Sequence, residues 1–384
     1  MTLTPELRAA GLAALRRYDR PLRLPGAPAA SPPVPLLGEQ RDEQIAAAFL
    51  QPLGSGLINH TFRIDTAALG HEPPVQAVLQ RVNPLFGIAV NDDIAAITDH
   101  LQQVGLPTPQ LYRTSEGATA VDLGSGGVWR LLTLMPGDTF NKVSPALAHQ
   151  AGRLVARFHH SLLGLRHRFR FTRPGAHDFG RHRQNLRAAV AKAPTVADLP
   201  DEFAGLAAEI LGRCAEVPLE LDGPLRLCHG DLKISNLLFL PGADGHVGHC
   251  LVDLDTLAYL PLPLELGDAL RSWCNPYDEN NPEGRFDLEL FTAAISGYAA
   301  HAAAFVTAAE RQQLVAGTLR VALQLAARFA ADVVNQSYFG WDATRFRSRA
   351  EHNLIRARGQ LSLARSLSQQ RPQAEAVVAR LFPE

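Results

Sequence analysis

The sequence predicts an α/β protein of two lobes, a small β-rich lobe followed by a larger helical one. Its 384 residues are too many for one small module and suit two lobes that share a cleft. The stretch 41–136 reads as strands broken by glycines, whereas 137–384 is dominated by runs with helical periodicity. For residues 1–40 we expect a short N-terminal helix and a linker rich in proline and alanine.

Composition excludes several classes of protein. Hydrophobic residues make up 46% of the chain and charged residues 20%, which is typical of a globular protein rather than a disordered one. No apolar run reaches the ~20 residues of a membrane-spanning helix, and the first residues lack the basic-then-apolar order of a secretory signal. The four cysteines show no CxxC spacing, and the net charge is −1. We therefore expect a cytoplasmic protein that binds neither nucleic acid nor membranes.

Periodicity places the individual elements. Strands of the small lobe are expected at 58–64, 75–82 and 128–137. Helices are expected at 91–104, at about 310–334 and at about 345–367. Asn91 is a suitable N-cap for the first of these helices, and the pair Ser144-Pro145 predicts that another helix begins there.

The most informative motif is LCHGDLKISNLL at 227–238. Asp231 is followed five residues later by Asn236, with apolar segments on both sides, which is the spacing of a phosphotransferase catalytic loop. An aspartate there can align the acceptor hydroxyl and accept its proton, and the asparagine oxygen can bind magnesium. Lys233, one of only three lysines in the chain, can reach the transferred phosphoryl group. The alternative is a solvated turn between two buried strands.

A second motif, CLVDLDT at 250–256, supplies two carboxylates. Because strand side chains alternate, Asp253 and Asp255 at the end of an apolar strand are expected to point to the same side. Two like charges there are costly without a cation, and oxygen donors suit Mg²⁺ rather than zinc. We therefore predict Asn236, Asp253 and Asp255 as magnesium ligands. An isolated pair of this kind is often a strand end facing water, but its position after the first motif favours two linked catalytic strands.

A glycine-rich segment, GSGLINHTF at 54–62, precedes both motifs. Gly54 and Gly56 would let the backbone approach a polyphosphate closely, and Phe62 would cover the loop. Asn59 stands where a protein-kinase loop has its third glycine. A hairpin turn explains the two glycines equally well until their position ahead of the catalytic loop is considered.

These segments resemble the aminoglycoside-phosphotransferase-like small-molecule kinases, and among them most closely the bacterial N-acetylhexosamine 1-kinases. The resemblance covers about 54–367 and rests on GSGLINHTF, AVLQRVN, LCHGDLKISNLLF and CLVDLDT with LELGDALR, and more loosely on LAARFAADVVNQSYFGW and EHNLIRARGQLSLARS. It implies a bilobal protein-kinase-like fold that uses ATP and Mg²⁺. It also implies that Asp231 is the catalytic base, that Asn236 and Asp253 bind magnesium, and that the segment from Met135 to Gly137 is the adenine hinge.

One departure from the kinase pattern affects the nucleotide site. No lysine precedes Lys142, so the strand lysine that usually pairs with phosphate is absent. Gln80 or Arg81 must take its position, and a one-residue difference in register decides which. The partner carboxylate on the following helix would be Asp93 or Asp92.

The acceptor is predicted to be a neutral sugar. The C-terminal resemblance implies an N-acetylhexosamine or related hexose, phosphorylated at its anomeric hydroxyl. Arg271 would donate to sugar hydroxyls or else pair with Asp268, which is expected to brace the catalytic loop. Trp273 would stack on the sugar ring unless it is buried. Other polar and aromatic groups expected in the acceptor lobe are Asn275, Tyr277, Tyr338 and Trp341.

Two rival functions are compatible with the sequence. A pseudokinase that binds nucleotide without turnover would explain the altered glycine loop and the missing lysine, but the complete HGDxxxxN motif and Asp253 argue against it. An aminoglycoside, choline or another cationic acceptor would suit the carboxylates of Asp278, Glu279 and Glu283. The sequence leaves open the acceptor, the choice of ATP or GTP, and the oligomeric state.

Overall fold

The computed structural model describes residues 3–20, 22, 24, 34–35, 50–53, 59–65, 76–173, 175, 177–196, 199–243 and 245–382. The chain divides into two units. Unit 1 comprises Met1–Pro136, Leu165–Arg173 and Cys250–Asp255, and unit 2 comprises Gly137–Gly164, Pro174–His249 and Thr256–Glu384. Two segments that the sequence division gave to the larger lobe therefore belong to unit 1. Gly54, Gly56 and most of the predicted linker lie outside the described residues.

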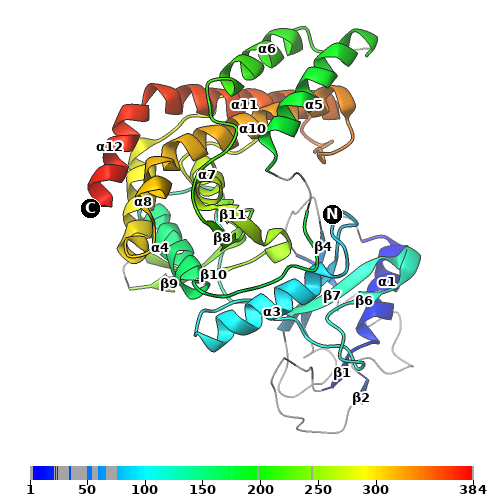
Figure 1. Ribbon diagram of the computed structural model, residues 1–384. Coiled ribbons are helices and arrows are strands. Elements are labelled where there is room, and N and C mark those ends of the chain that lie inside the picture. Colours follow the sequence, from blue (N-terminus) through cyan, green and yellow to red (C-terminus); the bar gives the residue numbers. More distant parts are fainter. Residues whose placement is uncertain are drawn as a thin grey trace. The chain divides into compact units, whose positions relative to one another are not determined.

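Among the described residues, unit 1 contains a five-stranded antiparallel sheet with the strand order β3-β4-β5-β7-β6 (Figure 1). Its strands are β3 (Gln51–Pro52), β4 (His60–Asp65), β5 (Gln76–Arg81), β6 (Val121–Asp122) and β7 (Val128–Thr133). Gln80 pairs with Thr61 on β4 and with Arg130 on β7. Because strand side chains alternate, these three residues share one face of the sheet. The sheet confirms the predicted β-rich lobe.

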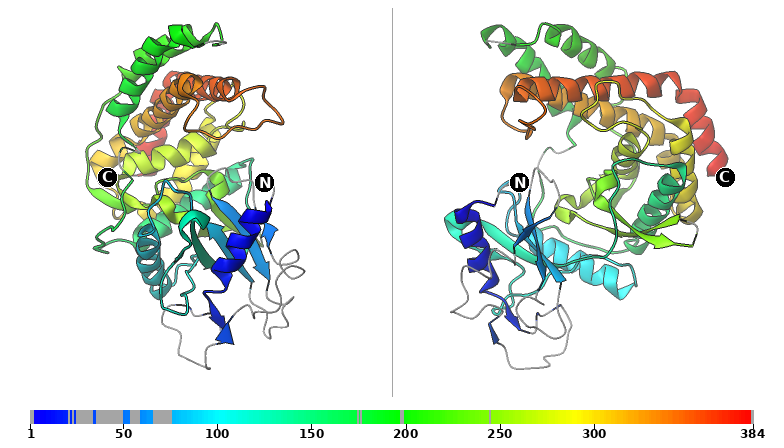
Figure 2. Two further views of the ribbon diagram at one scale, coloured as in Figure 1. Left: turned by 90° about the vertical axis from the view of Figure 1, so that its right-hand side faces the viewer. Right: turned by 180° about the vertical axis from the view of Figure 1, so that it is seen from behind.

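The opposite face of this sheet is covered by α1 (Pro5–Leu15), which lies across the strands (Figure 2). Thr4 caps the helix by accepting the N–H of Leu7 at 3.3 Å. Residues of the helix and of the sheet form one buried cluster that includes Leu7, Ala14, Leu15, Phe62, Leu79, Trp129 and Leu131. The N-terminal helix is therefore part of the core of unit 1, whereas the sequence predicted a segment separate from both lobes. A two-stranded sheet of β1 (Asp19–Arg20) and β2 (Val34–Pro35) follows α1.

The helix predicted over 91–104 is α3 (Val90–Gln103). It begins one residue earlier than predicted, and Asn91 lies inside the helix, where it donates to the carbonyl oxygen of Ile88 at 2.9 Å. Asp92 and Asp93 occupy the first turn, where negative charge is favoured by the helix dipole.

Unit 2 is mainly helical, as predicted for the larger lobe (Figure 1). Its helices are α4 (Pro145–Ser161), α5 (Phe179–Lys192), α6 (Phe203–Cys214), α7 (Leu262–Trp273), α8 (Leu288–Ala302), α9 (Ala308–Gln312), α10 (Leu314–Asn335), α11 (Arg349–Gln369) and α12 (Arg371–Leu381). Ser144 accepts the N–H of Leu147 at 3.2 Å, which confirms the predicted start of α4. The helix predicted over 310–334 is divided between α9 and α10.

Two short sheets complete the fold. β8 (Leu225–Cys228) pairs with β11 (Ala258–Pro261), and β9 (Leu237–Gly242) pairs with β10 (Gly245–Leu251). The catalytic-loop motif lies between β8 and β9, and the second motif follows β10.

α7 and α10 approach each other at two glycines. A Cβ on Gly317 would lie 2.1 Å from the carbonyl oxygen of Pro263, and one on Gly267 would lie 2.6 Å from that of Gly317. α10 is long and apolar enough by composition to cross a membrane, and 89% of its most apolar window is buried inside the protein. The close contact with this buried helix fixes α7, which carries several of the side chains described below.

Candidate active site

The catalytic loop begins where β8 ends, in unit 2. Gly230 has a φ of +81°, and a Cβ at this position would lie 2.3 Å from the carbonyl oxygen of Thr256. Only glycine fits this combination of backbone angle and contact. The Thr256 hydroxyl also donates to the carbonyl oxygen of His229 at 2.8 Å. The backbone immediately before Asp231 is therefore held at two points.

Asp231, Lys233 and Asn236 lie together in this loop. Lys233 Nζ is 2.9 Å from Asp231 Oδ2, and Asn236 Nδ2 donates to the Asp231 carbonyl oxygen at 2.8 Å and to Oδ2 at 3.2 Å. Burial raises the pKa of Asp231, but the charge and hydrogen bond of Lys233, with the charges of His229 and Arg271, hold it below its ordinary value. Asp231 is therefore a carboxylate at neutral pH that can align a hydroxyl group and accept its proton.

Glu265 on α7 holds the first part of the loop. Its Oε1 accepts the N–H of His229 at 2.7 Å, and its Oε2 accepts the N–H of Gly230 at 2.9 Å. Oε1 also lies 3.4 Å from His159 Nε2, and the other ring nitrogen of His159 is 2.9 Å from the Tyr298 hydroxyl. Glu265 was not among the site residues predicted from the sequence. The available signal was a carboxylate three residues before Asp268, on the same face of the helix.

Asp268 holds the next part of the loop by accepting the N–H of Leu232 at 2.8 Å, the bracing role expected for it. Arg271 is buried and donates to Asp268 at 3.0 and 2.8 Å and to Glu279 at 3.0 Å. The structure therefore shows the pairing alternative for Arg271 rather than a group directed at substrate.

Trp273 requires a second correction. Its side chain is 1% exposed, and its indole N–H donates to the carbonyl oxygen of Leu232 at 2.8 Å. A ring this buried cannot stack on a sugar. Arg271 and Trp273, which were predicted with Asp231 to contact substrate, are thus supports of the catalytic loop.

The second motif, in unit 1, departs from the strand geometry expected of it. β10 ends at Leu251, and Asp253 has a φ of +66°, so strand alternation no longer applies to the two aspartates. Asp255 lies in a 3-10 turn (Leu254–Thr256), and both of its oxygens accept hydrogen bonds from Arg130. Its Oδ2 also accepts from Asn59 at 2.7 Å. The prediction of Asp255 as a magnesium ligand is therefore wrong, because its carboxylate is already paired.

Arg130 is the second residue that the sequence analysis missed. Its side chain is 2% exposed, and it donates to Gln80 at 2.9 Å and to Asn91 at 3.3 Å in addition to Asp255. The signal in the sequence was a charged residue inside the apolar run VWRLLTL.

The register of β5 answers the question left open about Gln80 and Arg81. Gln80 shares a face with Arg130 and donates to the Thr61 hydroxyl at 3.1 Å, so both ends of its amide are engaged. Arg81 lies on the opposite face against Gly127, where a Cβ would be 2.6 Å from Arg81 Nε. Neither residue therefore offers a cation on the Arg130 face.

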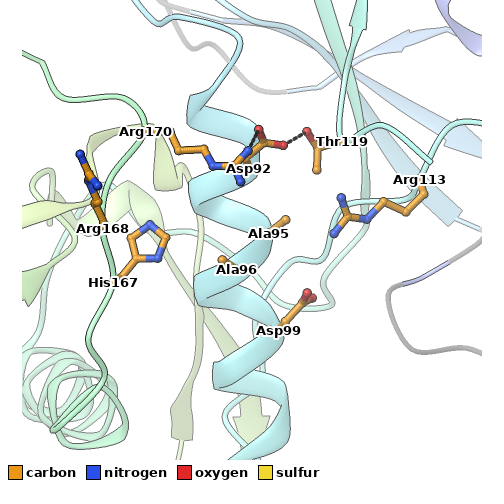
Figure 3. A pocket seen from close by; sticks show the side chains of 9 residues that line it. All are labelled: Asp92, Ala95, Ala96, Asp99, Arg113, Thr119, His167, Arg168 and Arg170. Carbon is orange, nitrogen blue, oxygen red and sulfur yellow. Dashed lines mark hydrogen bonds and ion pairs between the residues drawn. The ribbon is translucent and has the colours of Figure 1, made fainter. Parts of the chain in front are cut away.

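Asp93 and Asp92 do not form the expected phosphate clamp. Asp93 is buried and accepts the N–H groups of Arg170 and Phe171, each at 2.9 Å, and its Oδ1 lies 2.8 Å from His167 Nε2. Asp92 accepts from the Thr119 hydroxyl at 2.7 Å and from Arg170 at 2.9 Å, beside a hollow of about 460 Å³ over α3 (Figure 3). These carboxylates anchor α3 to Leu165–Arg173.

Met135 and Gly137 flank the residue at which the first segment of unit 1 ends. Gly137 has a φ of +127°, and a Cβ there would lie 2.9 Å from the carbonyl oxygen of Phe239. Asp138 and Phe239 exchange two backbone hydrogen bonds of 2.9 and 3.0 Å. The start of unit 2 is thus joined to β9, directly after the catalytic loop. The adenine-binding role of this connector stays a prediction.

Asn236 in unit 2 and Asp253 in unit 1 each carry an oxygen donor of a type that suits magnesium. Asn236 uses its amide nitrogen to hold Asp231, which leaves its oxygen as the atom that can bind a cation. Asp253 supplies a carboxylate, the ligand type that Mg²⁺ prefers. With Asp255 paired to Arg130, the predicted set is reduced to these two residues.

Comparison with known proteins gives the family. Residues 50–304 match the model of the phosphotransferase enzyme family. The aminoglycoside phosphotransferase of Alicyclobacillus acidocaldarius has a similar fold, with a TM-score of 0.57 and 18% identity over 97% of this chain and 98% of that one. Amicoumacin kinase in complex with AMP-PNP, Ca²⁺ and Ami is also similar, with a TM-score of 0.54 and 14% identity over 84% of this chain and 93% of that one. The choline kinase of Cryptosporidium parvum has a TM-score of 0.52 and 15% identity over 87% of this chain and 93% of that one. These likenesses confirm the predicted protein-kinase-like fold, and the chain belongs to the phosphotransferase enzyme family.

Proposed function

We propose that this protein transfers the γ-phosphoryl group of ATP to the anomeric hydroxyl of a neutral sugar, an N-acetylhexosamine or related hexose, in a Mg²⁺-dependent reaction. Its family makes it an ATP-dependent small-molecule phosphotransferase. The observation that carries the proposal is the contact of Asp231 with both Lys233 and Asn236. These residues lie in a loop that is held by Gly230, Glu265 and Asp268. A cytoplasmic location, where ATP and magnesium are available, is part of the proposal.

Each residue of the loop has a chemical task in this reaction. Asp231 aligns the acceptor hydroxyl and accepts its proton while the acceptor oxygen bonds to the γ-phosphorus and the bond to the β–γ bridging oxygen breaks. Lys233 keeps Asp231 ionised through their 2.9 Å contact. Asn236 and Asp253 would hold Mg²⁺, which neutralises charge on the phosphates when it is bound.

Charge pairing in unit 2 supports a neutral acceptor. Of the three carboxylates that favoured a cationic one, Glu279 lies 3.0 Å from Arg271, which it shares with Asp268. Asp278 accepts the N–H of Asn280 at 2.8 Å in a local turn. Tyr277 is 41% exposed, so its ring can contact the apolar face of a sugar.

A cationic acceptor is the second candidate, because similar structures include an aminoglycoside phosphotransferase and a choline kinase. Mg-ATP assays with hexoses, N-acetylhexosamines, aminoglycosides and choline separate the two. The expected product is a sugar phosphate that hydrolyses in mild acid. Turnover confined to cationic acceptors would overturn the sugar assignment.

Variants test the assigned roles. Asp231→Asn should lower kcat by about 10²–10⁴-fold, the usual contribution of a general base. Asp253→Ala should raise the Mg²⁺ concentration needed for half-maximal rate, and EDTA should abolish turnover. Asp222→Asn, which changes an exposed aspartate elsewhere in unit 2, is the control and should keep wild-type activity. Unchanged activity in both site variants would refute the assignment.

A further inference from the structure

The buried guanidinium group of Arg130 is a charged centre that the proposed reaction leaves unexplained. It lies on β7 with 2% of its side chain exposed, in a strand otherwise composed mainly of apolar residues. A buried charge is costly unless it is both paired and hydrogen-bonded. Its presence in the middle of a strand therefore requires a compensating arrangement of partners.

That arrangement is nearly complete. Within the described part of the chain, four of the five guanidinium N–H groups have an acceptor. Nε donates to Gln80 Oε1 at 2.9 Å, and Nη1 donates to Asn91 Oδ1 at 3.3 Å. Nη1 and Nη2 together bind the two oxygens of Asp255 as a fork, the Nη2 bond measuring 3.0 Å. The group is thus held by a neighbouring strand, by α3 and by the segment that contains Asp253.

Asp255 is fixed from its other side as well. Asn59 donates to Asp255 Oδ2 at 2.7 Å, and the oxygen of the same amide accepts the N–H of Asn83 at 2.9 Å. Asp255 is therefore joined to the start of β4, to the residues after β5 and to β7. The side chain of Asp255 therefore ties the short segment Cys250–Asp255, which enters unit 1 from later in the chain, to the sheet.

The consequence falls on Asp253, two residues earlier. Its φ of +66° lies in the left-handed region, which residues other than glycine rarely adopt. Such a conformation persists only when the surrounding structure determines it strongly. The Arg130–Asp255 pair fixes the chain on the C-terminal side of Asp253 and so supports this conformation.

We propose that Arg130 is the positioning residue for Asp253, and that the Arg130–Asp255 pair takes the place of an ion pair between a strand lysine and a helix carboxylate. The inference rests on the proposed Mg²⁺-dependent reaction. Gln80 on the adjacent strand is neutral and binds Arg130, and Asn91 supplies a neutral acceptor from α3. This buried centre therefore contains one positive and one negative charge, those of Arg130 and Asp255.

The test removes both charges together. Arg130→Gln/Asp255→Asn keeps hydrogen-bonding side chains but leaves no unpaired buried charge, so the fold should be retained. The Mg²⁺ dependence of AMP-PNP binding is measured by calorimetry, and kcat by a coupled assay. We expect the half-saturating Mg²⁺ concentration to rise about tenfold or more, as when the outer residues of a metal site are changed. The KM for the acceptor should stay within about twofold, because the substitutions do not change the contacts that bind the acceptor equally in the ground state and the transition state.

Unit 2 offers a matched control. Arg226 and Glu310 form a comparable forked pair, with bonds of 2.6 and 2.8 Å and side chains 15% and 0% exposed. Arg226→Gln/Glu310→Gln should leave the Mg²⁺ dependence unchanged. If the Arg130 variant keeps the wild-type Mg²⁺ dependence, the inference falls while the proposed function stands. A wild-type protein that binds no Mg-nucleotide would overturn both.

Arg130→Lys serves if the double variant fails to fold. Lysine keeps the charge but loses the forked geometry. We expect a smaller rise in half-saturating Mg²⁺, about threefold to tenfold, as for a weakened support of a metal ligand. A wild-type value in this variant would equally overturn the inference.

Discussion

Glu265→Gln tests how α7 holds the catalytic loop, because it keeps the shape of the side chain and removes one acceptor. The carboxylate accepts the N–H groups of His229 and Gly230, one on each oxygen. A glutamine can accept only one of them, and its NH₂ group would face the other N–H. A donor left buried without a partner costs about 1–3 kcal/mol, and hydrogen bonds to a charged group are about twice as strong as neutral ones. We therefore expect the free energy of unfolding to fall by about 2–4 kcal/mol.

The assay combines urea denaturation with steady-state kinetics. If the loop moves to relieve the unpaired N–H, Asp231 is displaced. The value of kcat then falls by about tenfold for each 1.4 kcal/mol of transition-state stabilisation that Asp231 no longer provides. Glu375→Gln on α12 is the control, since Glu375 makes a single ion pair, with Arg371, at the surface. Exposed pairs contribute about 0–1 kcal/mol, so this control should lose little stability and keep its kcat. Equal losses in the two variants would refute the reasoning.

The pH dependence of stability gives a second readout. Burial raises the pKa of Glu265. The hydrogen bond and charge of His159, the charge of His229 and the hydrogen bond from the Gly230 N–H together outweigh burial and bring this pKa below its ordinary value of 4.5. A carboxyl group whose pKa is lowered in the folded state contributes stability above its unfolded pKa and loses it as pH falls through the folded value. The wild-type advantage over Glu265→Gln should therefore be constant near pH 7 and shrink progressively below about pH 4.5.

Two glycine substitutions provide further tests. Gly230→Ala should lower stability and turnover more than Gly164→Ala. The two glycines have similar φ values, +81° and +78°, but only at Gly230 would the added Cβ lie 2.3 Å from a backbone oxygen. The backbone strain costs about 1–2 kcal/mol in both variants, and the clash adds about 1–3 kcal/mol in Gly230→Ala alone. Gly317→Ala should separate α10 from α7 and lower both the melting temperature and kcat, whereas Gly212→Ala on α6, with open space around it, should stabilise the protein by up to about 1 kcal/mol. Equal effects within either pair of variants would contradict the packing described here.

Local patterns predicted the elements and the catalytic loop well. Within the loop at 227–238, Lys233 and Asn236 contact Asp231 from at most five residues away. The contacts of this loop with Thr256, Glu265 and Asp268 join distant residues. The start of α4 follows from a cap and a proline, which are also local signals. Such features are set by short-range sterics and hydrogen bonds, and these can be read from a sequence.

The errors arose where contacts join distant residues. Asp255 was assigned to the metal because strand alternation was extended past Leu251, where the backbone had already left the strand. Its partner Arg130 is 125 residues away, and no periodicity connects the two positions. Arg271 and Trp273 were assigned to the substrate because a polar or aromatic residue near a motif looks the same whether it faces a ligand or the core.

The first turn of α3 shows why such residues are hard to interpret from sequence. Asn91, Asp92 and Asp93 are typical helix-starting residues, since carboxylates there are favoured by the helix dipole. In the structure each holds a different part of unit 1: Asn91 accepts from Arg130, Asp92 joins Thr119 to Arg170, and Asp93 accepts the backbone N–H groups of Leu165–Arg173. These three consecutive residues therefore contact both of the later segments that belong to unit 1. Leu165–Arg173 is bound directly, and Cys250–Asp255 is bound through the Arg130–Asp255 pair. A turn that local propensity explains completely thus also carries the long-range contacts that support Asp253.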